Sequence, residues 1–162
     1  MPLNTLEEIA TYIVSEGKGI LAADESNPTC GKRFDSIGVN STEENRRDYR
    51  EMLFRSGWMK GNIGGVILFD ETIRQNAKDG TSLVDIISKQ GALPGIKVDK
   101  GLQPLEGSPE ESLTQGLDGL EERCDEYSKL GAKFTKWRAV IRIGDDIPSD
   151  QCIQKNMQAL AD

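Results

Sequence analysis

Five charged side chains lie at the ends of short apolar segments that predict β-strands: Asp24, Lys97, Asp99, Lys136 and Arg138. Lys97 and Asp99 are two residues apart, as are Lys136 and Arg138, and side chains two residues apart share one face of a strand. Buried charges are costly unless they are paired, so an ion network without a catalytic role is one interpretation. The other is a catalytic site, because crowded cations lower the pKa of a lysine and nearby carboxylates move protons. Three converging cations also favour a phosphorylated substrate.

A second group of candidate phosphate ligands follows the first of these strands. Ser26 and Thr29 are three residues apart in a predicted loop over residues 25–31, and Arg33 comes shortly afterwards. Hydroxyls, cations and the free N–H groups of a helix start all bind phosphate. Ser and Thr are also common turn residues, so a solvated surface loop is the alternative. Arg46, inside a predicted helix, has the same two interpretations.

Composition excludes several classes of site. The 162 residues contain no histidine, which rules out histidine triads, His-ligated zinc and histidine acid–base catalysis. The net charge is -7, so the chain lacks the basic surface that binds nucleic acid or an anionic membrane. The three cysteines include no C-x-x-C pair, which favours free thiols in a reducing compartment. No apolar run is long enough to span a membrane, and the N-terminus lacks signal-peptide features, so we expect a cytoplasmic protein.

Predicted strands and helices alternate along the chain. Capping boxes at Thr5 and Ser41 predict helices ending at Gly17 and near Arg55. A third box at Ser108 predicts a helix up to residue 130, with a Pro at its first position. The remaining predicted helices are residues 82–90 and a final helix from Ser149 that has Ile153, Met157 and Leu160 on one face. The predicted strands are residues 19–24, 64–70, 94–99 and 132–141.

This alternation indicates a parallel sheet covered by helices. The two candidate folds are a doubly wound sheet and a (β/α) barrel. A doubly wound nucleotide-binding domain would carry G-x-G-x-x-G after its first strand, or G-x-x-x-x-G-K-[ST], and the sequence has neither. A barrel would send the apolar strand faces toward the helices and the charged faces inward. The charges would then meet at the C-terminal ends of the strands, where barrel enzymes have their active sites.

Six sequence blocks, in order along the chain, resemble the class I, Schiff-base fructose-1,6-bisphosphate aldolases. The blocks are residues 17–26, 42–47, 64–69, 95–101, 114–120 and 136–138. The resemblance implies an α/β fold, the (β/α)8 TIM barrel. A complete barrel has eight strands and about 250 residues, so residues 1–162 would be the N-terminal half of a single barrel domain, with an N-terminal helix and the first four β/α units.

The resemblance also implies an activity. Such enzymes are metal-independent lyases of glycolysis and gluconeogenesis. They reversibly cleave fructose 1,6-bisphosphate to dihydroxyacetone phosphate and glyceraldehyde 3-phosphate, and they need no cofactor. The family implies a cytoplasmic homotetramer whose partner is a small sugar phosphate, with no nucleic acid or membrane partner. The Schiff-base lysine and the main acid–base glutamate would lie beyond the matched segment, so we expect this chain alone to be inactive. A non-catalytic half barrel that binds a phosphosugar or a protein partner is the alternative.

The resemblance assigns roles to eight residues. Asp24 would assist proton transfer, and Lys136 would be the cation beside the Schiff-base lysine that lowers its pKa. Lys97 would bind a substrate phosphate, and Arg138 would pair with neighbouring carboxylates. The family associates four further positions with substrate phosphate: Ser26, Thr29, Arg33 and Arg46. Thr29 stands where the family usually has a second serine, so the hydroxyl is retained with a different reach.

Overall fold

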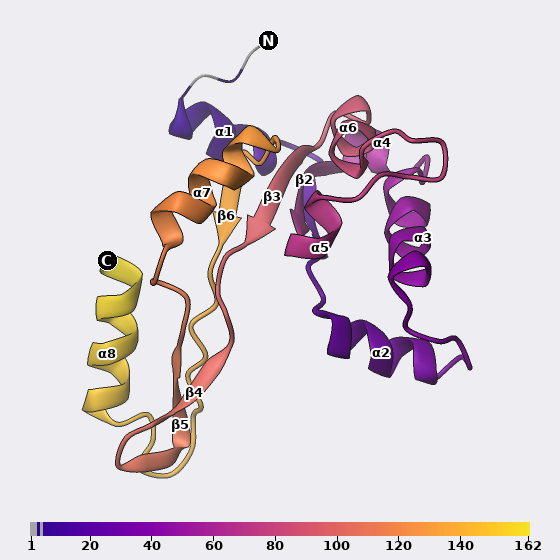
Figure 1. Cartoon of the computed structure of the whole chain (residues 1–162). Helices are drawn as coiled ribbons and strands as arrows, with labels where there is room; N and C mark the ends of the chain where they lie inside the picture. Colours follow the sequence, from indigo (N-terminus) through magenta and orange to yellow (C-terminus); the bar gives the residue numbers. More distant parts are fainter. Residues whose placement is uncertain (1–2, 4) are drawn as a thin grey trace. The chain divides into compact units, whose positions relative to one another are not determined.

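The computed structural model describes residue 3 and residues 5–162, and the chain divides into two compact units. The first unit comprises Met1–Lys97 and Asp125–Thr135, and the second comprises Val98–Cys124 and Lys136–Asp162. Figure 1 shows the elements of both units along the chain.

A four-stranded sheet, in the order β1-β2-β3-β6, forms the centre of the first unit, to which all of its residues belong except Lys136, the last residue of β6. Its strands are β1 (Gly19–Ala23), β2 (Ile63–Leu68), β3 (Leu93–Lys97) and β6 (Phe134–Lys136). β1 pairs with β2, and β2 with β3, in parallel. The prediction of a parallel sheet is therefore confirmed for β1, β2 and β3.

The two faces of the sheet differ in burial. Ala23, Leu68 and Ile96 stand side by side in the register and are fully or almost fully buried, at 0%, 0% and 1% exposure. On the opposite face, Ile20 is 46% exposed. The face with Ala23 is thus the apolar, helix-covered face, as the sequence predicts for a barrel.

Gly95 and Phe134 identify what packs on the opposite face. A Cβ atom at Gly95 would lie within 2.5 Å of three atoms of the Phe134 ring, and one at Gly65 would lie 3.0 Å from the same ring. Phe134 therefore lies flat over positions where β2 and β3 have no side chain. The absence of a Cβ is what lets an aromatic ring approach the sheet this closely.

The first helix is α1 (Leu6–Ile13), and its capping box is confirmed. The Thr5 side chain accepts a hydrogen bond from the Glu8 backbone N–H, and the Glu8 carboxylate accepts one from the Thr5 N–H. The helix ends at Ile13, not at Gly17. Val14 leaves helical geometry with ψ 21°, and the turn finishes at Gly17, whose φ of +79° favours glycine.

The predicted loop over residues 25–31 is wrong, because most of it belongs to α2 (Asn27–Asp35). Ser26 is the extended N-cap residue, and Pro28 stands in the first helical turn, where its missing N–H costs nothing. The prediction failed because a run rich in Ser, Asn, Pro and Gly is also typical of turns. The correction matters because it gives Ser26 and Thr29 fixed positions on a helix.

Four further helices complete most of the first unit: α3 (Glu43–Phe54), α4 (Met59–Asn62), α5 (Asp70–Ile73) and α6 (Leu83–Lys89). The cap of α3 is shifted by one residue from the prediction. Its N-cap is Thr42, whose hydroxyl accepts from the Asn45 N–H, and not Ser41. The helix predicted over residues 82–90 is confirmed, with Ser82 as its cap and Gly91 just beyond its end at φ +82°.

The second unit contains a hairpin where a helix was predicted. Residues Ser108–Thr114 form strand β5, which pairs antiparallel with β4 (Leu102–Leu105), and α7 runs only over Leu120–Lys129. Pairing with β4 outweighs the local helix-start signal at Ser108, as tertiary context often does. Gly116, at φ +132°, and Gly119, at φ +63°, then separate the strand from the helix.

Glu111, which the sequence analysis placed in a capping box, instead contacts the start of α8 (Asp150–Ala161). Its carboxylate accepts hydrogen bonds from the Ser149 N–H and hydroxyl, both at 2.7 Å. The start of α8 at Ser149 is confirmed. Ile153, Met157 and Leu160 share one face of this helix as predicted, but that face is exposed, whereas Cys152 and Asn156 are buried on β5.

The strand predicted over residues 132–141 is much shorter in the structure. Only Phe134–Lys136 forms β6, so Arg138 lies outside regular structure. The Thr114 hydroxyl donates to the Arg138 carbonyl at 2.8 Å, which ties this irregular segment to the end of β5. At Arg138, a hydrogen bond from a side chain therefore takes the place of the backbone pairing that the predicted strand would have made.

Cys30, Cys124 and Cys152 are all free thiols. Among the residues that the structure describes, no helix is long and apolar enough to cross a membrane.

Candidate functional site

Asp24 and Lys97 occupy equivalent positions at the ends of two strands. Ala23 pairs with Leu68 and Leu68 with Ile96, so the residues that follow, Asp24 and Lys97, are in register two strands apart. Alternation places both on the face opposite the buried apolar residues. This is the face on which Phe134 packs, and it is the face predicted from the spacing of the charges.

Ser26 and Thr29 come together at the start of α2. The two hydroxyl oxygens are 3.1 Å apart. Ser26 is the N-cap residue, but its side chain makes no capping bond to the helix backbone. A pair of hydroxyls beside the first turn of a helix offers donors to an anion, in a region where the helix dipole also favours negative charge.

Arg33 is on the same helix and shares a carboxylate with a buried arginine. Its guanidinium lies 3.0 Å from Glu25 and is 58% exposed. Glu25 also accepts at 2.6 Å from Arg50, which is only 2% exposed. The Tyr49 hydroxyl is a third neighbour of Glu25, at 3.4 Å. Glu25 is thus the shared anion of a compact charge cluster next to the hydroxyl pair.

Arg46 is held in a two-pronged ion pair. Its Nε and Nη2 atoms donate to the two carboxylate oxygens of Glu71 at 2.7 and 2.6 Å, and its Nη1 donates to the Ser41 carbonyl at 2.7 Å. Asn27 donates to Glu71 at 3.3 Å. Hydrogen bonding from Arg46 lowers the pKa of Glu71 below its usual range. Arg46 therefore joins α3 to α5 and, through Glu71, to the first turn of α2.

Lys136 and Arg138 belong to the second unit. Lys136 is the half-buried last residue of β6, two residues after Phe134 on the same face of that strand. Arg138 is exposed, and its carbonyl accepts a hydrogen bond from the Thr114 hydroxyl. The structure thus places Asp24, Lys97 and the Ser26–Thr29 hydroxyl pair on the first unit. Lys136 and Arg138 are on the second unit.

A clamp in the second unit fixes the segment after β3. The Arg123 guanidinium donates to the Val98 carbonyl at 3.0 Å and also to the Gly116 carbonyl. The Lys100 N–H donates a further hydrogen bond to the Gln115 carbonyl at 2.7 Å. Asp99, which is 8% exposed, lies within this clamped segment.

Sequence reasoning missed Glu25, Arg50 and Glu71. One signal was present: Arg46 and Arg50 are four residues apart and so share one face of α3. Their carboxylate partners lie two residues after the end of β1 and three residues after the end of β2. Recognising the pairs required knowing that the fold brings α3 to these two segments.

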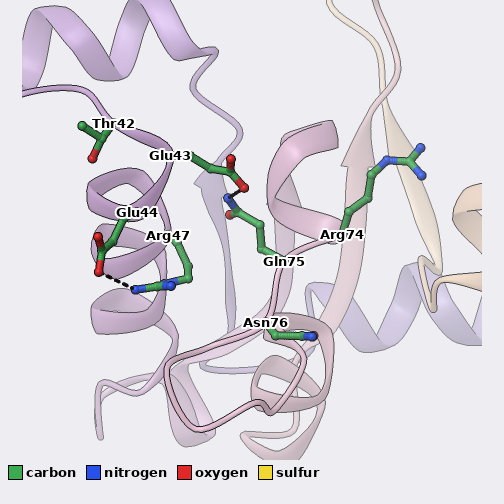
Figure 2. Close-up of a pocket in the computed structure, with 7 residues that line it drawn as sticks. All are labelled: Thr42, Glu43, Glu44, Arg47, Arg74, Gln75 and Asn76. Carbon is green, nitrogen blue, oxygen red and sulfur yellow. Dashed lines mark hydrogen bonds and ion pairs between the residues drawn. The ribbon is translucent and has the colours of Figure 1, made fainter.

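An open hollow of about 710 Å³ lies between α3 and the segment after α5, and none of the predicted site residues line it. Figure 2 shows its lining: Thr42, Glu43, Glu44, Arg47, Arg74, Gln75 and Asn76. Arg47 pairs with Asp48 and Glu44, and Arg74 pairs with Asp70 and Glu126. Over the described part of the chain, no group of three His, Cys, Asp or Glu residues is arranged to hold a metal.

Comparisons with known proteins bear on this arrangement. The family model for class I fructose-bisphosphate aldolase matches residues 5–162. The chain belongs to the class I fructose-bisphosphate aldolase family. A probable class 1 aldolase of Xanthomonas campestris is 55% identical over 161 residues, which cover 99% of this chain and 48% of that protein. The Drosophila melanogaster aldolase is 55% identical over 157 residues, which cover 96% of this chain and 44% of that protein.

The fold is also that of the family. A solved Plasmodium falciparum aldolase, crystallised in complex with TRAP and a small-molecule inhibitor, aligns with a TM-score of 0.92 at 47% identity. The alignment covers 94% of this chain and 45% of that one. The chain spans about half the length of the curated relatives it matches. Its parallel sheet thus corresponds to part of a TIM barrel, and the barrel is not closed by these residues.

Proposed function

We propose that this chain supplies the N-terminal half of a single-domain barrel that cleaves fructose 1,6-bisphosphate by a Schiff-base mechanism in the cytoplasm, as part of glycolysis and gluconeogenesis. The observation that carries the proposal is the register that puts Asp24 and Lys97 at equivalent strand ends, within a chain that matches the family over almost its full length. A homotetramer is part of the proposal by family analogy.

Each polar group has a task that its chemistry suits. Asp24 is the carboxylate that takes part in proton transfer, and Lys97 supplies a cation to a phosphate group. Lys136 is the ammonium that disfavours protonation of the Schiff-base lysine and so keeps that amine nucleophilic. The Schiff-base lysine and the main acid–base glutamate are assigned to the remainder of the barrel.

The remaining residues bind substrate. Ser26 and Thr29 donate hydroxyl hydrogen bonds to a phosphate, supported by their 3.1 Å separation at the start of α2. Arg33 and Arg46 add positive charge near them, and each is oriented by a carboxylate, Glu25 or Glu71. Arg138 pairs with carboxylates at the same end of the barrel.

A chimera tests the proposal. The chain is joined to the remaining half of the Xanthomonas relative, and release of glyceraldehyde 3-phosphate from fructose 1,6-bisphosphate is followed in a coupled assay. We expect cleavage by the chimera, and loss of most of it in an Asp24→Asn chimera. A folded chimera without activity, or one that Asp24→Asn leaves unimpaired, would contradict the proposal.

A further inference from the structure

We propose that Arg50 is a positioning residue that holds the Ser26 and Thr29 hydroxyls in the geometry needed to bind a phosphate group. The inference rests on the proposed function, because it assigns those hydroxyls to a substrate phosphate. Arg50 itself is not proposed to contact the substrate. It acts through the backbone and side chains on either side of the hydroxyl pair.

The contacts of Arg50 bracket the pair in the sequence. Its Nη1 lies 2.6 Å from the Glu25 carboxylate, and its Nη2 donates to the Glu25 carbonyl at 3.0 Å. The same Nη2 lies 3.6 Å from the Cys30 sulfur. Ser26 directly follows Glu25, and Thr29 directly precedes Cys30. One guanidinium therefore holds the residue before the first hydroxyl and the residue after the second.

The helix turn between those two points is closed by its own hydrogen bond. The Cys30 N–H donates to the Ser26 carbonyl at 2.9 Å, and Cys30 is fully buried. Burial raises the pKa of the Cys30 thiol, so the sulfur is a neutral neighbour of the guanidinium. With both ends of the turn fixed, the hydroxyl pair is fixed as well.

The Arg50 side chain is buried and packs against its neighbour Tyr49. It is 2% exposed and lies on α3, where its guanidinium also lies 5.2 Å from the centre of the Tyr49 ring. Only an arginine presents several donors in one plane, which allows it to reach a carboxylate, a carbonyl and a sulfur together. A lysine would retain one charge contact and lose the others.

The energetics favour a geometric role. A buried ion pair is often no more stabilising than apolar residues of the same volume, so burial of Arg50 with Glu25 is weak evidence for stability. Such a pair does fix two segments in one relative arrangement. The segment fixed here carries the two candidate phosphate hydroxyls.

The experiment compares Arg50→Lys with Arg47→Lys in the 162-residue chain. Arg47 is on the same helix, but its ion pairs are with Glu44 and Asp48 and not with α2. The first measurement is the Kd for inorganic phosphate, from amide chemical shifts. The second is hydrogen exchange at the Cys30 backbone amide without ligand. Far-UV circular dichroism checks that each variant is folded.

We expect Arg50→Lys to weaken phosphate binding at least about fivefold, the equivalent of one lost hydrogen bond. Exchange at the Cys30 amide should accelerate about tenfold, because the first turn of α2 opens more often. Arg47→Lys should change neither quantity. A folded Arg50→Lys variant with unchanged phosphate affinity and unchanged exchange would overturn the inference.

Two further outcomes are covered by the design. If Arg50→Lys fails to fold, Glu25→Gln replaces it, since it keeps the size of the side chain and removes the charge that Arg50 contacts. Unaltered exchange at the Cys30 amide in that variant would also overturn the inference. If the unmodified chain binds no phosphate, the assignment of the hydroxyls to a substrate phosphate fails, and the exchange measurement alone still decides whether Arg50 holds the turn.

Discussion

Replacement of Gly95 by alanine is expected to destabilise the chain by about 1–3 kcal/mol, the usual cost of overpacking a well-packed core. The new Cβ would lie 2.3, 2.4 and 2.5 Å from three carbons of the Phe134 ring. Carbon atoms in contact prefer a separation of about 3.5–4.0 Å, so the ring would have to move by more than about 1 Å. The ring also lies over Gly65, where a Cβ would be 3.0 Å away, so it cannot simply slide along the sheet.

Urea unfolding of the chain measures this cost. The matched control is Gly19→Ala, since Gly19 is also a strand glycine, has nothing within 4 Å of its Cβ position and has no positive φ. We expect the control to change the free energy of unfolding by less than about 0.5 kcal/mol. The double variant Gly95→Ala, Phe134→Leu should recover part of the loss, because the smaller side chain makes room, and a double-mutant cycle gives the coupling.

Equal unfolding free energies for Gly95→Ala and Gly19→Ala would refute this reasoning. They would mean that Phe134 does not pack against β3. The assignment of Lys97, two residues after Gly95 on the same face of the strand, to the inner face would then lose its structural basis.

Four other predictions concern charge, substrate and assembly. In the chimera, Lys136→Met should lower kcat more than tenfold, which corresponds to an activation barrier higher by about 1.4 kcal/mol or more, and should raise the pH at which the Schiff base forms. Lys136→Arg should recover part of the activity. An unmoved pH–rate profile for Lys136→Met would count against the role of Lys136. Ser26→Ala should raise KM with little change in kcat, as steady-state kinetics would show, because it removes one phosphate donor and no charge; a change confined to kcat would exclude that role. The Glu71 pKa is depressed from its ordinary 4.5, so the ion pair stabilises the fold fully above the unfolded-state pKa and loses that contribution as the pH falls through the folded-state value. The difference in unfolding free energy between the unmodified chain and Glu71→Gln should therefore shrink on acidification. A constant difference would be inconsistent with the ion pair. The chain alone should self-associate in sedimentation velocity experiments, because β1 and β6 are the edges of the sheet and Ile20 is 46% exposed; a sharp monomer would contradict this.

Local signals predicted three of the four strands of the parallel sheet and the starts of four of the described helices well. Short apolar runs located β1, β2 and β3, and hydroxyl caps located α1, α6 and α8 to within a residue or two. Strand alternation also predicted the face of Asp24 and Lys97, because a period of two leaves a strand only two choices of face.

The hairpin at Ser108 could not be predicted in the same way. Its sequence carries a genuine helix-start signal, and the decisive contact is with β4, a separate strand. Nor did the sequence indicate which face of α8 is buried. Asn156 is buried because it donates to the Ser112 carbonyl, and no hydrophobic pattern signals such a polar contact.

In the candidate site too, some residues could be predicted from the sequence and others could not. The residues that resemble the family could be named from the sequence, but the carboxylates that orient them could not. Glu25 meets Arg50 across 25 positions, and Glu71 meets Arg46 across 25. Long-range ion pairs of this kind depend on how helices cross the strand ends, which only the folded chain defines.

Borohydride trapping with dihydroxyacetone phosphate tests the central claim most directly. The chain alone and the chimera are each reduced in the presence of the ketose phosphate, and intact mass and peptide mapping locate any adduct. We expect one adduct on the chimera, on a lysine of the Xanthomonas half, and none on the 162-residue chain. An adduct on the chain alone, at Lys97, Lys136 or any other lysine, would contradict the assignment of the nucleophile to the other half of the barrel.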